Sequence, residues 1–168
     1  MPNLNTLPNT IGKLTILKEL RLSILGLTSL PGSIGNLTNL KTLDISDMPS
    51  LNSLPNTVGK LTILEELCLS NLDLKFLPGS IGDLTNLDIL HISDMPRLNS
   101  SLPNAIGKLT ILKELRLSIL GLTSLPGSIG NLINLKTLHI SDMPRLNSLP
   151  NTIGELTILE GLSLSNLD

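Results

Sequence analysis

The sequence predicts an α/β solenoid, in which one repeated unit coils along an axis and places parallel strands on one face and short helical turns on the other. Three observations support this fold. The pattern LPxxIGxLxxLxxLxLS recurs along the chain, leucine makes up 43 of the 168 residues, and the four methionines share one position of the repeat. Such internal periodicity is the signature of stacked repeat architectures. We therefore expect one domain that spans residues 1–168.

Seven units follow one another and alternate between two types of 23 and 24 residues, with one extra serine near residue 100. The units begin at Leu7, Leu30, Leu54, Leu77, Leu102, Leu125 and Leu149. The chain starts and stops within a unit, and neither end shows the polar capping unit that solenoids usually need for solubility. We therefore expect either a fragment of a longer array or a chain whose uncapped ends associate end to end.

Each unit is expected to open with an irregular arm, because the proline after the leading leucine has no amide donor. The segment GxLTxLxx, residues 12–19 in the first unit, predicts a short helix or 3₁₀ turn. Its apolar spacing would turn Ile11, Leu14 and Leu17 towards the core. The methionine row is expected to pack inside the loops.

A short strand follows in each unit. In the first unit, alternation turns Leu20 and Leu22 towards the core and Arg21 towards the opposite face. Parallel strands lie about 4.8 Å apart, so equivalent residues of successive units form rows across that face. The middle row contains Arg21, Asp44, Cys68, His91, Arg116, His139 and Ser163.

The motif LxxLxLxx, present seven times, resembles the leucine-rich repeat family over essentially the whole chain. The segment LPxxIGxL is similar to Ras-group and plant-type repeats, and LKTLDISDMPSLNSLP is similar to repeats of plant disease-resistance receptors. The resemblance implies a right-handed, arc-shaped solenoid with a concave parallel β-sheet and short helical or 3₁₀ convex segments. The chain departs from the family where asparagine usually follows LxLxx, because leucine or methionine stands there. The usual amide ladder would therefore be absent.

The resemblance also implies a function, which is non-catalytic recognition of a protein partner on the concave face. Arginine is enriched in interface hot spots, and the face carries further charged and imidazole side chains. The residues predicted to bind the partner are Arg21, Asp44, Glu66, His91, Asp94, Arg116, His139 and Asp142.

Two alternatives stay open. Regular rows of hydroxyl groups are what a protein that binds an extended surface, such as ice or a polysaccharide, would present. Either of two rows could take that role. The threonine row lies on the convex arm and contains Thr15, Thr38, Thr62, Thr85, Thr110 and Thr157. The serine row lies on the concave face and contains Ser23, Ser46, Ser70, Ser93, Ser118, Ser141 and Ser165. The other alternative is a fragment of a larger leucine-rich repeat receptor with no activity of its own.

Other classes are not favoured. A net charge of −2 argues against a nucleic-acid partner or a charged membrane surface. No membrane helix or signal peptide is seen, which predicts a cytoplasmic location. One cysteine makes no internal disulfide. We expect no cofactor, because no phosphate-binding glycine motif occurs.

We also expect no enzyme and no metal site. Cys68 and His91 are neighbours in the middle row, but the sequence shows no third group that would orient them for nucleophilic catalysis. His91 and His139 are two strands apart, roughly 10 Å, which is too far to share a zinc ion. Calcium is disfavoured by the same spacing in the row Asp47, Asp94 and Asp142.

Overall fold

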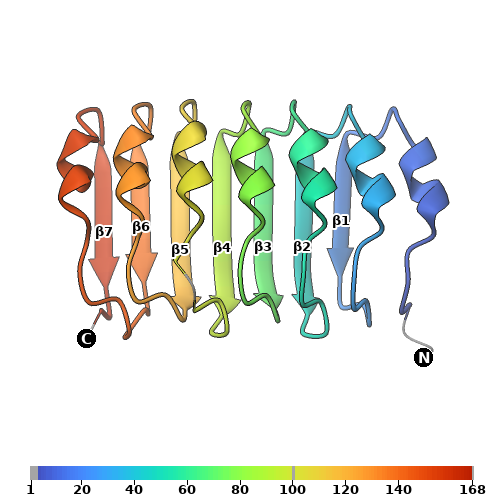
Figure 1. Ribbon diagram of the computed structural model, residues 1–168, viewed down its shortest axis with the longest axis horizontal. Coiled ribbons are helices and arrows are strands. Elements are labelled where there is room, and N and C mark those ends of the chain that lie inside the picture. The colour runs from blue at the N-terminus through green and yellow to red at the C-terminus, as the bar shows by residue number, and fades with distance from the viewer. Residues whose placement is uncertain (1–3, 100, 168) are drawn as a thin grey trace.

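The computed structural model describes residues 4–99 and 101–167 as one coil in which each repeat unit makes one turn, here called a rung. Seven strands form a single parallel sheet in chain order, and a row of 3₁₀ helices covers one face of it (Figure 1). The strands are β1 (Glu19–Ser23), β2 (Thr42–Met48), β3 (Glu66–Leu72), β4 (Ile89–Met95), β5 (Glu114–Leu120), β6 (Thr137–Ser141) and β7 (Gly161–Ser165). The helices are η1 (Asn9–Lys13), η2 (Gly32–Asn36), η3 (Asn56–Lys60), η4 (Gly79–Asp83), η5 (Asn104–Lys108), η6 (Gly127–Asn131) and η7 (Asn151–Glu155). The predicted solenoid is therefore confirmed.

Each 3₁₀ helix starts directly after the proline of the arm, three residues earlier than the sequence predicted. In the first rung Pro8 has an extended backbone, with φ −69°, and its carbonyl accepts a hydrogen bond of 3.0 Å from the Ile11 amide. The helix ends when the Leu14 amide donates to the Ile11 carbonyl at 3.0 Å. The proline fixes its own φ and leaves its carbonyl free to accept, so the turn begins there rather than at Gly12.

The core lies between the sheet and the helices and consists of leucine, isoleucine and methionine from every rung. Leu43 and Leu90, which point inward from β2 and β4, are fully buried. The predicted packing of the methionines is confirmed for three of them, because Met48, Met95 and Met143 are fully buried. Met1 lies outside the described residues.

Successive 3₁₀ helices touch where a glycine of one rung meets a small residue of the next. A Cβ atom placed on Gly82 would lie 2.2 Å from the carbonyl oxygen of Ala105, and one on Gly59 would lie 2.6 Å from that of Ser80. The contact recurs from rung to rung at Gly12, Gly35, Gly59, Gly82, Gly107 and Gly130. None of the described glycines has a positive φ, so backbone conformation does not explain why glycine stands here. These positions need glycine because the backbone of the next rung comes too close for a side chain.

Gly82→Ala should therefore lower the free energy of unfolding by about 1–3 kcal/mol, because the added methyl group pushes two rungs apart. Gly79→Ala in the same helix is the matched control, since a Cβ there meets nothing within 4 Å. The control should stay within about 0.5 kcal/mol of the parent. Urea unfolding measures both values, and equal stability of the two variants would contradict the close-approach argument.

Candidate partner-binding face

The face of the sheet that is turned away from the 3₁₀ helices, here called the open face, is the concave face of the sequence prediction. Strand register places the middle row in the predicted order. Arg21 pairs with Asp44, Cys68 with His91, and Arg116 with His139. Glu66 lies two positions before Cys68 on the same face of β3, next to Ile89 of β4. Asp94 and Asp142 lie further along, where the strands end. The predicted residues therefore occupy the open face and the edge of the sheet where the strands end, here called the lower edge.

The centre of the open face carries a continuous line of polar contacts across three rungs. Cys68 Sγ lies 3.5 Å from Glu66 Oε1 and 3.9 Å from His91 Nδ1. His91 Nε2 lies 2.8 Å from Glu114 Oε1, and the same carboxylate forms an ion pair with Arg116. Glu114 is thus a third group beside Cys68 and His91, and the expectation that none exists was wrong. The signal was present in the sequence, because Glu114 lies two residues before Arg116 on the strand next to His91.

The electrostatics of this line oppose nucleophilic chemistry. Burial, followed by the neighbouring Glu66 carboxylate, raises the pKa of the Cys68 thiol from 9.0 to about 12. The thiol is therefore protonated at neutral pH, whereas the thiolate is the nucleophile. Partial burial alone would raise the pKa of Glu114, but the hydrogen bond to His91 and the Arg116 guanidinium outweigh it and lower that pKa. Glu114 is consequently held as a carboxylate that orients its two neighbours.

Alkylation of Cys68 by iodoacetamide at pH 8 should be at least about tenfold slower in the folded protein than in urea, because a raised pKa removes most of the thiolate and the higher nucleophilicity of the remainder offsets only part of that loss. Glu66→Gln should speed the folded-state reaction, since it removes an acceptor and a negative charge beside the sulfur. Equal rates in the folded and unfolded protein would contradict the assigned pKa.

At the edge where the strands end, one residue in each rung has a left-handed backbone with φ between 51° and 54°. These residues are Ile24, Asp47, Asn71, Asp94, Ile119, Asp142 and Asn166. Asparagine and aspartate tolerate this region, whereas a β-branched residue there is strained. The asparagines also donate to the aspartate of the rung before, from Asn71 Nδ2 to Asp47 Oδ1 at 3.0 Å and from Asn166 Nδ2 to Asp142 Oδ1 at 2.7 Å.

Ile119→Asn should stabilise the protein by about 1 kcal/mol, because it relieves left-handed strain at a β-branched residue. The new amide would face Asp94 as Asn71 faces Asp47. Ile119→Val is the control, which keeps the branched Cβ and should bring no gain. The midpoint of urea unfolding reports the effect, and a midpoint for Ile119→Asn below that of the parent would argue against strain at this position.

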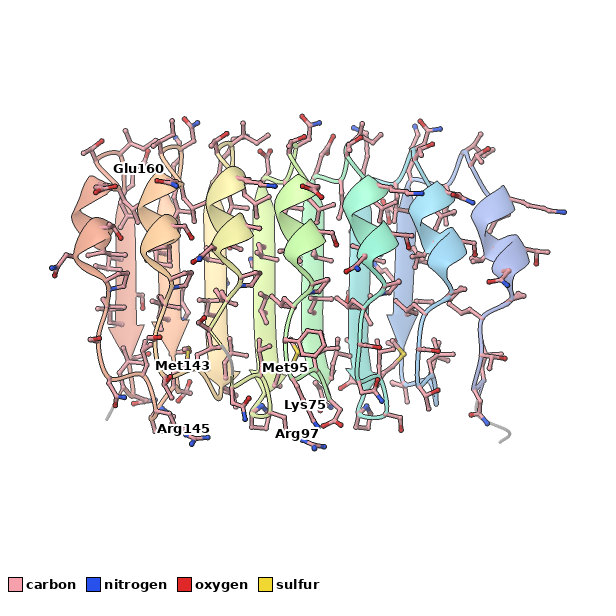
Figure 2. All side chains as sticks on the ribbon, viewed as in Figure 1. Lys75, Met95, Arg97, Met143, Arg145 and Glu160 are labelled. Carbon is pink, nitrogen blue, oxygen red and sulfur yellow. The ribbon has the colours of Figure 1, made fainter. Side chains whose placement is uncertain are left out.

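The same edge is hollowed over the first four rungs. Two shallow hollows, of about 150 and 420 Å³, share Pro49 and Asn71 in their walls. Arg97 borders the smaller one and forms an ion pair of 2.9 Å with Asp73. Figure 2 shows Arg97 and Arg145 projecting at this edge, below the ends of the strands. The open face therefore continues into a groove with both acidic and basic walls.

The threonine row lies where the arm turns back towards the sheet, and all six threonines are exposed. In this region, asparagine side chains join adjacent rungs in pairs: the first to the second, the third to the fourth and the fifth to the sixth. Their Nδ2 atoms donate at 2.7 Å from Asn39 to the Thr15 carbonyl, from Asn86 to that of Thr62 and from Asn134 to that of Thr110. These three separate bonds, here called the asparagine ladder, lie away from the position at which asparagine is usual in leucine-rich repeats.

Among residues 4–99 and 101–167, no three histidine, cysteine, aspartate or glutamate side chains gather in a way that could hold a metal ion. None of the helices in that part of the chain has the length and apolar character needed to cross a membrane. The cytoplasmic location stays a prediction.

A family model described as a leucine-rich repeat region matches residues 3–100. The chain therefore belongs to the leucine-rich repeat family, which confirms the resemblance inferred from the sequence. No curated protein sequence matches the chain.

Solved structures extend the similarity to nearly the full chain. The leucine-rich repeat domain of the type III effector XopL is 27% identical, with a TM-score of 0.74, over 98% of this chain and 67% of that one. A leucine-rich repeat protein of Leptospira interrogans is 28% identical, with a TM-score of 0.67, over 99% of this chain and 47% of that one. The plant peptide hormone receptor RGFR1, in complex with RGF2, is 31% identical, with a TM-score of 0.74, over 98% of this chain and 31% of the receptor. The chain thus spans less than half the length of the last two proteins.

Proposed function

We propose that this chain is a non-catalytic recognition scaffold that binds a protein partner on the open face. The observation that carries the proposal is the line of contacts from Glu66 through Cys68, His91 and Glu114 to Arg116. It fixes charged and imidazole groups across three rungs at the centre of the face. Preorganised side chains lose less entropy when a partner binds.

The shape of the face favours a polypeptide over a small molecule. The hollows are shallow and lie in a row along the lower edge, whereas small-molecule sites are concave and enclose most of the ligand. The similar receptor RGFR1 was solved in complex with RGF2, which supports a peptide or protein ligand for a repeat sheet of this kind. The raised pKa of the Cys68 thiol supports the absence of nucleophilic catalysis.

Two arginines are the accessible anchors of this face. The side chain of Arg21 is 67% exposed beside Glu19, and that of Arg116 is 55% exposed beside Glu114. Exposed ion pairs of this kind contribute little to stability, so both guanidinium groups are available to a partner at low cost to the fold.

The double variant Arg21→Ala with Arg116→Ala should weaken partner binding at least about tenfold, which corresponds to about 1.4 kcal/mol, without changing the circular dichroism spectrum. A partner captured by the parent protein and identified by mass spectrometry is titrated against both proteins by calorimetry. Lys108→Ala is the control, since this exposed residue lies on η5 behind the sheet. Unchanged affinity of the double variant would refute binding on the open face.

A second candidate is binding of ice or a polysaccharide through the threonine row. The observation that favours it is that all six threonines are exposed, while the asparagine ladder fixes the backbone beside three of them. The remaining alternative, a portion of a larger receptor, is supported by the share of the similar proteins that the chain spans.

If the threonine row binds ice, the parent protein should inhibit ice recrystallisation, and Thr62→Lys with Thr85→Lys should abolish that inhibition by disrupting the regular array. Arg21→Ala, on the opposite face of the sheet, serves as the control. Absence of inhibition by the parent protein would eliminate ice as the ligand of this row.

A further inference from the structure

The edge of the sheet where the strands begin, here called the upper edge, carries a row in which isoleucine and asparagine alternate from rung to rung. The isoleucines are exposed, and they are Ile16, Ile63, Ile111 and Ile158. The asparagines between them are those of the asparagine ladder, whose amides donate back to the rung before. The interior isoleucines Ile63 and Ile111 line a hollow of about 360 Å³, with Asn86 of the rung between them. Exposed apolar side chains therefore recur every two rungs along this edge.

A row of charged side chains runs beside the isoleucines and changes sign every two rungs. Over the first six rungs, two lysines are followed by two carboxylates and then by two more lysines, in the order Lys18, Lys41, Glu65, Asp88, Lys113 and Lys136. Backbone hydrogen bonds of 2.7 to 2.9 Å join each of these residues to the next, so they lie on adjacent rungs. Lys41, Glu65 and Asp88 line the same hollow as the two isoleucines. The two rows therefore form one surface that is organised in steps of two rungs.

The two-rung step selects the conformation of a segment that can lie along the upper edge, where the turns of the coil line up (Figure 1). Two rungs span about 9.6 Å. A polyproline II helix has three residues per turn and rises about 9.3 Å per turn, so every third side chain meets the next step. An extended strand repeats its face about every 6.7 Å, and an α-helix does so every two turns, about 10.8 Å. Both of these lose register over a few steps, whereas polyproline II keeps it.

Charge specifies the side chains of that segment. Glu65 and Asp88 are neighbouring carboxylates, and each forms an ion pair with the lysine on its outer side, Lys41 for Glu65 and Lys113 for Asp88. The four side chains are between 36% and 55% exposed, and exposed pairs of this kind contribute little to stability. A cation placed between the two carboxylates would offset their mutual repulsion. The complementary segment thus has a basic residue over the carboxylates and an acidic residue one turn away on each side, over the lysine pairs.

We propose that the upper edge binds a proline-rich peptide segment in the polyproline II conformation. In each three-residue turn of the segment, one side chain faces the charged row and one apolar side chain enters the hollow between two isoleucines. The charges along the segment follow the order acidic, basic, acidic. A proline-rich chain already populates this conformation, so little entropy is lost when it binds. The surface contains neither Arg21 nor Arg116, so the proposal is independent of partner binding on the open face.

Synthetic peptides test the match. The probe has three triplets, Glu-Leu-Pro, Lys-Leu-Pro and Glu-Leu-Pro, and a second probe exchanges the first two residues of each triplet to fit the opposite chain direction. In the control peptides, glutamate and lysine are exchanged. The tighter of the two probes should bind at least about tenfold more tightly than its control by fluorescence anisotropy, although the net charge of −2 favours the more basic control. Absence of binding at millimolar peptide, or equal affinity for probe and control, would overturn the proposal.

A pair of protein variants assigns the binding to the upper edge. Ile63→Ser with Ile111→Ser removes the apolar walls of the hollow, so it should bind the probe at least about tenfold more weakly while its circular dichroism spectrum stays unchanged. Arg21→Ala with Arg116→Ala is the matched control on the open face and should bind the probe like the parent. This control separates the two proposals, since it should impair only binding on the open face. Loss of probe binding in the arginine variant, or full binding in the serine variant, would refute the assignment.

A charge exchange provides a test that leaves the apolar walls intact. Glu65→Lys with Asp88→Lys should weaken binding of the probe at least about tenfold and should bind a peptide of three Glu-Leu-Pro triplets more tightly than the parent does. Asp44→Lys with Asp73→Lys makes the same change in net charge on β2 and at the lower edge. This control should keep the preference of the parent between the two peptides. If both double variants change that preference equally, the assigned charge order is wrong.

Discussion

The distance between neighbouring rungs is the constraint on which the rest of this molecule depends. Hydrogen bonding between parallel strands holds it at about 4.8 Å, and the layer of 3₁₀ helices has to accept the same spacing. It does so because Gly82 and its equivalents lie directly against the backbone of the next rung. The inward leucines then fill the space between the two layers. Each rung obtains its buried surface from its neighbours, and a single rung has no core of its own.

The repeat made the fold predictable from the sequence, whereas contacts between rungs were harder to foresee. The register of LxxLxLxx placed every strand, and the methionine row indicated where the loops are buried. The start of each helix depends on a hydrogen bond to the carbonyl of a proline such as Pro8, and the spacing of apolar residues gives no sign of that bond. The role of Glu114 depends on the rotamers of His91 and Arg116 on adjacent strands. Isoleucine disfavours a left-handed backbone, so the positive φ of Ile119 is imposed by the coil and not by its own sequence.

Differences between the units lie mainly on the surface of the coil. The third unit differs from the first at seven positions, and only Val58 among them is buried. The other six are Glu65, Cys68, Asn71, Asp73, Lys75 and Phe76. Several of these gain partners on adjacent rungs, as Glu65 does with Lys41 and Asp73 with Arg97. The coil is therefore held by a repeated core, while surface residues carry most of what distinguishes the third rung from the first.

The central claim, that each rung is stabilised by its neighbours, is tested most directly by native-state hydrogen exchange measured by NMR on the dilute protein. The account predicts that amides of β3, β4 and β5 are the most protected, and that protection falls towards β1 and β7, since an end rung has one neighbour instead of two. Protection of β1 and β7 equal to that of β4 would contradict the account, because it would mean that rungs hold their structure without flanking contacts.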